Sequence, residues 1–120
     1  MLRQKRKVIS PNTLGYRRNK AIIKLSQDQK PDWTFLTNHA HVFLCIADEP
    51  NMLMRDVSRR VGITERAVQR IVVDLEKAGY LKRIRHGRRN HYVVHDDLPF
   101  RHPIEKHERV SSLIALILDK

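Results

Sequence analysis

The sequence contains little cysteine, little glycine and few aromatic residues, and it has no long hydrophobic run. One cysteine and four glycines occur among 120 residues, and aromatic residues make up 6%. The lone Cys45 excludes a disulfide within the chain and is typical of a reducing compartment. No apolar run approaches the roughly 20 residues that span a membrane. The basic start, residues 1–7, lacks the apolar stretch of a secretory signal. We therefore expect a cytoplasmic protein with no membrane partner.

The patterns that carry catalysis or bind metal are also missing. The sequence shows no glycine-rich phosphate loop, no nucleophile elbow and no paired carboxylates in an apolar setting. His41 and Cys45 stand four residues apart and could share a metal ion. However, no Cys-x-Cys pair occurs, and no His-x3-His pair has a matching partner that would complete a site. We expect no enzyme activity, no cofactor and no metal.

Positive charge is abundant and unevenly distributed. Lys and Arg number 24 against 13 Asp and Glu, which gives a formal net charge of +11. Such an excess indicates a polyanionic partner. Residues 1–30 hold nine basic residues and one acid, and residues 81–95 hold five basic residues and no acid. The basic N-terminal segment has no broad apolar helical face of the kind that membrane binders use, so nucleic acid is the favoured partner.

The middle of the chain has the spacing of two helices joined by a tight turn. Val57 and Val61 stand four residues apart and so share one helical face. Gly62 follows at once, where a helix that ends in a left-handed residue prefers glycine. Thr64 can cap a second helix through its hydroxyl. The pattern predicts a helix-turn-helix. The expected helices are residues 55–61 and 64–78.

A basic hairpin is expected directly after these helices. Gly79 should end the second helix, and two short runs with β-branched and aromatic residues then flank a turn that contains Gly87. The tip carries no acidic residue. Beside a helix-turn-helix, a basic hairpin is typical of the wing of a winged helix. The expected tip residues are Arg85, His86, Arg88, Arg89 and Asn90.

Two further elements are expected before the wing. Residues 32–48 have apolar positions near a 3.6-residue period, with Pro31 and Asp32 as start signals, and predict a first helix. The short apolar run of residues 52–54 fits a small strand that pairs with the wing.

A last helix is expected at residues 104–118, with Pro103 in its first turn. Its apolar residues cover more than one face, and a helix of this kind usually needs a second partner. We interpret it as a dimerisation helix, and the alternative is that it packs on the first helix of its own chain. The residues expected in the dimer contact are Val110, Leu113, Ile114, Leu116, Ile117 and Leu118.

The expected fold is α+β, mainly α: a winged helix-turn-helix with a C-terminal helix. Three segments are predicted. Residues 1–31 form a basic N-terminal arm that is partly flexible, residues 32–95 form the winged helix, and residues 96–120 form a connector and the dimerisation helix.

Residues 33–103 resemble the winged helix-turn-helix regulators of bacteria and archaea, the group that includes the MarR-type and ArsR-type repressors. The resemblance rests on the runs Arg55–Ser58 and Gly62–Ile71, on Leu75–Leu81, and on the wing residues Gly87–Tyr92. It implies a winged helix fold with duplex DNA as the ligand. Together with the expected dimerisation helix, it leads to the hypothesis of a homodimeric transcriptional regulator that binds double-stranded DNA in a sequence-specific way. The recognition helix would enter the major groove, and the wing would lie on the adjacent minor groove or backbone.

Three groups of residues are expected to contact DNA. The recognition helix should present five residues to the DNA: Thr64, Glu65, Arg66, Gln69 and Arg70. Arg66, Gln69 and Arg70 are the candidates for base readout, because arginine pairs with guanine and glutamine with adenine. The wing should add the five tip residues named above. Arg55, Arg59 and Arg60 on the preceding helix should contact the DNA backbone.

Two other function classes stay open. One is a winged helix that serves as a protein-interaction module, which a less basic wing would favour. The other is an RNA-binding module without operator specificity, which would need exposed aromatic residues for base stacking.

Overall fold

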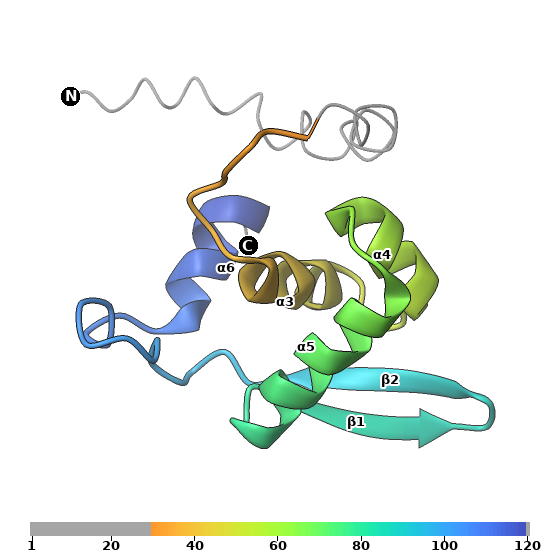
Figure 1. Ribbon diagram of the computed structural model, residues 1–120. Coiled ribbons are helices and arrows are strands. Elements are labelled where there is room, and N and C mark those ends of the chain that lie inside the picture. Colours follow the sequence, from red (N-terminus) through yellow and green to blue (C-terminus); the bar gives the residue numbers. More distant parts are fainter. Residues whose placement is uncertain (1–29, 120) are drawn as a thin grey trace.

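The computed structural model describes residues 30–119. In this part of the chain three helices are followed by a two-stranded antiparallel hairpin and then by a fourth helix (Figure 1). In chain order the elements are α3 (Asn38–Asp48), α4 (Met54–Val61), α5 (Glu65–Lys77), β1 (Leu81–His86), β2 (Arg89–Val94) and α6 (Val110–Leu118). The mainly α winged helix-turn-helix with a C-terminal helix is confirmed. The predicted basic arm lies outside the described residues, except for Lys30 and Pro31.

Helix α3 is the centre of the core. Its residues 42–46 are all buried, and α4, α5, β2 and α6 all contact it. The helix is shorter than the predicted 32–48, and its cap is Thr37, whose hydroxyl accepts the Ala40 N–H at 3.2 Å. The prediction of Asp32 as the cap was wrong. Residues 32–36 lie outside the helix, and Phe35 in this segment is 91% exposed, so its apolar side chain adds nothing to the core.

Helices α4 and α5 form the predicted helix-turn-helix. Gly62 ends α4 with a φ of +85°, a left-handed conformation that glycine adopts without strain. Its N–H donates to the Ser58 carbonyl oxygen at 2.8 Å. Thr64 accepts the Ala67 N–H at 3.0 Å and caps α5, as predicted. Both helices begin and end within one residue of the expected positions.

The wing is the hairpin of β1 and β2. Leu81 pairs with Val94 at its base and His86 with Arg89 at its tip, so Gly87 and Arg88 form a two-residue loop. Gly87 has a φ of +61°, which suits the first loop position of a type II′ turn. Only the base of the hairpin enters the core, through the buried Leu81 and Tyr92. The basic tip therefore extends beyond the helices (Figure 1).

The predicted strand at residues 52–54 is absent. Leu53 is instead the N-cap of α4, and Met54 is already helical. Among the described residues, the backbone contact to this edge of the wing comes from Pro50, whose carbonyl oxygen accepts the Tyr92 N–H at 3.2 Å. The start of α4 uses the residues that a third strand would have needed.

Helix α6 begins at Val110, later than the predicted residue 104. Residues 101–108 form turns, so the placement of Pro103 in a helical first turn was wrong. The Val110 N–H donates to the Leu98 carbonyl oxygen at 2.9 Å, and the Ser111 N–H donates to the Asp96 carbonyl oxygen at 2.9 Å. Carbonyl oxygens of the connector thus accept the first two N–H groups of α6, which an N-terminal extension of the helix would otherwise have bonded.

The apolar residues of α6 divide into two sets. Val110, Leu113, Ile114 and Leu118 are buried within this single chain, where α6 packs along α3 (Figure 1). Leu116 is 78% exposed and Ile117 is 40% exposed. The residues of the first set, which were expected in the dimer contact, pack inside the chain instead. No helix in the described part of the chain is long and apolar enough to cross a bilayer.

Candidate nucleic-acid interface

Helix α5 separates its polar residues cleanly from its apolar ones. Val68, Ile71 and Val72 are buried against the core. The five predicted recognition residues, Thr64, Glu65, Arg66, Gln69 and Arg70, are all exposed. Because Thr64 caps the helix, the first-turn N–H groups and the positive end of the helix dipole lie at the same place as these side chains. The structure brings the predicted set together at the N-terminal half of α5.

The wing tip carries a concentrated positive charge. Arg85, His86, Arg88 and Arg89 are exposed, and Asn90 is half-buried. The Arg85 Nε–H donates to the Gly87 carbonyl oxygen at 3.2 Å, which holds its guanidinium beside the turn. The imidazole rings of His86 and His91 meet edge to face, with centroids 5.8 Å apart. The tip thus presents cations and hydrogen-bond donors on a two-residue turn.

The three arginines of α4 do not share one environment. Arg55 and Arg59 are exposed, and Arg59 lies 3.5 Å from the Asp56 carboxylate. Arg60 points inward: its side chain is 16% exposed and lies 3.5 Å from the Asp48 carboxylate, which is itself 5% exposed. Arg60 thus links α4 to the end of α3. Of the three arginines, only Arg55 and Arg59 have exposed side chains for a backbone contact.

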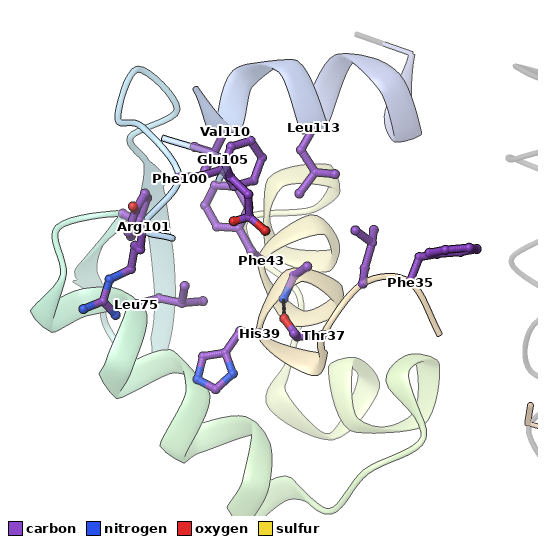
Figure 2. Close-up of a pocket in the computed structure, with 13 residues that line it drawn as sticks. Phe35, Thr37, His39, Phe43, Leu75, Phe100, Arg101, Glu105, Val110 and Leu113 are labelled. Carbon is purple, nitrogen blue, oxygen red and sulfur yellow. Dashed lines mark hydrogen bonds between the residues drawn. The ribbon is translucent and has the colours of Figure 1, made fainter. Parts of the chain in front are cut away.

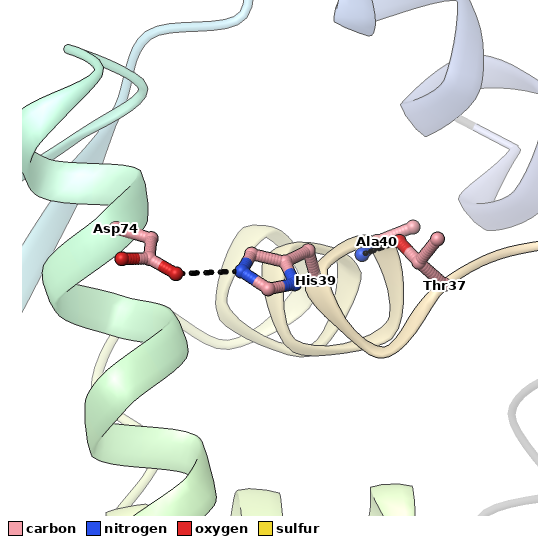
Figure 3. A network of polar contacts seen from close by, with 4 residues as sticks. All are labelled: Thr37, His39, Ala40 and Asp74. Carbon is pink, nitrogen blue, oxygen red and sulfur yellow. Dashed lines mark hydrogen bonds and ion pairs between the residues drawn. The ribbon is translucent and has the colours of Figure 1, made fainter.

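Two polar contacts that the sequence analysis missed fix α5 to its neighbours. His39 on α3 contacts Asp74 on α5 at 2.8 Å (Figure 3). At the other side, the Arg83 guanidinium on β1 donates two hydrogen bonds of 3.0 Å to the Glu76 carboxylate. No sequence motif marks these pairs, because each joins residues that the chain brings together only after it folds.

The Glu76 contact also affects ionisation in the wing. The hydrogen bonds to Glu76 raise the pKa of Arg83, and burial raises the pKa of the Tyr92 phenol. The Arg83 guanidinium lies 5.9 Å from the centre of the Tyr92 ring. At neutral pH the base of the wing therefore holds a charged arginine over a neutral phenol.

A cleft of about 250 Å³ lies between α3, α6, the connector and the C-terminal half of α5 (Figure 2). Phe43, Leu75 and Leu113 line its apolar wall, and His39, Arg101 and Glu105 contribute polar groups. Its lining comes from α3, α5, α6 and the connector, so the sequence analysis did not predict it. Because His39 also contacts Asp74, this cleft adjoins the attachment of α5 to α3.

Among the described residues, no group of three or more His, Cys, Asp or Glu side chains could hold a metal ion. His41 contacts Asn38 at 3.2 Å, and Cys45 is a buried core residue.

Residues 34–89, from the segment before α3 to the start of β2, match the model of the MarR family. Over this segment the chain is similar to the MarR family. Members of that family are DNA-binding transcriptional regulators.

Two solved structures of transcriptional regulators are similar to this chain. One is MepR, which regulates the Staphylococcus aureus multidrug efflux pump MepA, with 17% identity and a TM-score of 0.45, over 85% of this chain and 67% of MepR. The other is PcaV from Streptomyces coelicolor in complex with its natural ligand, with 25% identity and a TM-score of 0.46, over 89% of this chain and 74% of PcaV. No curated protein matches the chain.

Proposed function

We propose that this chain is a MarR-type transcriptional regulator, which recognises a specific double-stranded DNA sequence with α5 in the major groove. Arg66, Gln69 and Arg70 are exposed on one face of α5, and their side chains can form bidentate hydrogen bonds with guanine or adenine edges. Thr64 and Glu65 stand at the start of the helix, where its N–H groups suit a backbone phosphate. The observation that carries the proposal is this exposed set of base-reading side chains beside a basic wing.

The wing is proposed to lie on the adjacent minor groove or its phosphates. Arg88 occupies the loop of the hairpin, and it makes no ion pair with another described residue. Arg85, His86, Arg89 and Asn90 surround it. Contacts of this kind set the position of a protein on the duplex but carry little base information. The wing should therefore contribute affinity, and α5 should contribute sequence preference.

Two flanking regions complete the proposed contacts. Arg55 and Arg59 at the exposed side of α4 would contact the DNA backbone, and the basic arm of residues 1–31 would add phosphate contacts. Residues 32–95 are the proposed DNA-binding unit.

We further propose a homodimer in which residues 96–120 provide the subunit contact. The support is the exposed pair Leu116 and Ile117 on α6, since the four other large apolar residues of this helix already pack inside the chain. A two-fold dimer would place two recognition helices roughly 34 Å apart and would prefer a near-palindromic site. We place this regulator in the cytoplasm.

The test begins with selection of bound fragments from random duplex DNA. Affinity is then measured for the selected duplex, a shuffled duplex and the matching RNA at physiological salt. The proposal predicts that the selected duplex binds at least about 10³-fold more tightly than the shuffled one. Equal binding to both duplexes, or tighter binding to RNA, would favour the alternative of an interaction or RNA-binding module without operator specificity.

A further inference from the structure

The wing is attached to the turn between α3 and α4 by three contacts. The Tyr92 N–H donates to the Pro50 carbonyl oxygen at 3.2 Å. The Arg89 Nη2 group donates to the Asn51 carbonyl oxygen at 2.9 Å. The third contact joins the side chains of His91 and Asn51, with 2.6 Å between Nδ1 and Oδ1. Two of the three contacts converge on Asn51.

These contacts lie where the hairpin needs support. A hairpin of two strands is marginally stable by itself in water. Here Leu81 and Tyr92 anchor its base in the core, whereas its tip has no apolar packing against the helices. No third strand covers the edge of β2 in the described part of the chain, because Leu53 and Met54 belong to the start of α4. The Pro50–Asn51 turn replaces that strand.

We propose that Asn51 is a positioning residue for DNA binding, which holds the wing in the orientation that the duplex requires. This inference rests on the proposed function. An amide oxygen can only accept a hydrogen bond, so His91 donates through Nδ1–H, and this fixes its tautomer and ring orientation. The carbonyl oxygen of the same residue holds Arg89 at the tip. A wing ordered in advance loses less conformational freedom when DNA binds, and so binds more tightly.

Arg89 acquires two roles in this arrangement. A guanidinium has five N–H donors in a fixed fork, and one of its terminal nitrogens is used by Asn51. The remaining donors stay available for a phosphate. The neighbouring Arg88 has no such contact with another described residue, so the tip combines one tethered and one untethered arginine.

The test is a double-mutant cycle of Asn51→Ala and His91→Ala, measured as affinity for the selected duplex. Each single variant should weaken binding about three- to tenfold, which is the size of one net hydrogen bond. The double variant should lose no more affinity than the weaker-binding single variant, because both substitutions remove the same contact between Asn51 and His91. The slope of log affinity against log salt should stay at the wild-type value, because no phosphate-binding charge is removed.

Asn38→Ala is the matched control. It removes a side-chain contact of the same type, Asn38 to His41 at 3.2 Å, at the start of α3 and outside the turn that holds the wing. It should leave DNA affinity unchanged. Wild-type affinity for Asn51→Ala, or additive losses in the cycle, would overturn the proposal.

Hydrogen exchange of the free protein gives a readout that does not depend on DNA. The amides of residues 88–91 should exchange faster in Asn51→Ala, while those of α3 and α5 keep their protection. If wild-type protein showed no duplex preference, the proposed function would fail, and this exchange measurement would still decide whether Asn51 holds the wing. Unchanged wing exchange would show that it does not.

Discussion

Arg59 and Arg60 show what residue type and spacing can and cannot predict. Both are basic residues near the end of α4, and the sequence gives them the same role. In the structure Arg59 is exposed, whereas Arg60 points to Asp48, whose carboxylate is 5% exposed. The helical period alone left the face of Arg60 undecided, because its partner stands twelve residues earlier on another helix.

Arg60→Ala should therefore reduce stability, and Arg59→Ala should not. Loss of the Arg60 side chain leaves the carboxylate of Asp48 largely buried without this cation, so the free energy of unfolding should fall by roughly 1–3 kcal/mol. The exposed Arg59 pair should contribute less than about 1 kcal/mol. Denaturant unfolding monitored by circular dichroism measures both. Equal stability of the two variants would contradict the assigned environments.

His41 gives the fold a pH dependence of defined sign. Burial lowers the pKa of His41 from its usual value of 6.5, and the positive charge of Lys30 lowers it further. The unfolded chain therefore takes up this proton more readily than the folded chain, and stability falls as pH drops below about 6.5. His41→Gln should reduce the loss of stability between pH 7.5 and 5.5. His107→Gln, at an exposed position in the connector, is the control. An identical pH profile for wild type and His41→Gln would contradict this account.

At the scale of elements, the local signals were sufficient where the structure depends on nearby residues. Gly62, Thr64 and Gly87 act within their own turns, and the helix-turn-helix and the hairpin formed as predicted. The errors occurred where distant groups decide. Val110 starts α6 because Leu98 accepts its N–H, and Pro50 rather than a strand meets Tyr92. The exposed recognition residues were predictable from the helical period, whereas the contacts of Asn51, His39 and Glu76 were not.

Substitutions in the recognition helix and in the wing should affect DNA binding in different ways. Arg70→Ala or Gln69→Ala should cost on the order of 1–3 kcal/mol on the preferred duplex and relax its sequence preference, because each removes a base contact. Arg88→Ala should weaken the selected and the shuffled duplex alike and make the salt dependence shallower, because it removes a phosphate or minor-groove contact. Equal losses on both duplexes for all three variants would count against the division of roles.

At the scale of the whole molecule, the packing of α6 changes how dimerisation can be tested. Deletion of the helix would remove Leu113 and Ile114 from the core of the chain and so damage the fold itself. Leu116→Lys avoids this problem, because Leu116 is 78% exposed. We expect the variant to keep its thermal midpoint and to shift from dimer to monomer in sedimentation at micromolar concentration.

Ile104→Lys is the matched control for that substitution. Ile104 is also exposed, at 76%, but it lies in the connector outside α6. This variant should remain dimeric. A wild-type chain that is monomeric both free and on DNA would mean that α6 serves only its own domain.

The most direct test of the central claim, that the basic wing and α5 bind duplex DNA, is the salt dependence of wild-type affinity for the selected duplex. If about six phosphates are neutralised per molecule, log affinity should fall against log salt with a slope near −5 between roughly 50 and 200 mM. A slope shallower than about −2 would contradict the claim, because it would mean that the concentrated charge of the wing does not engage the DNA backbone.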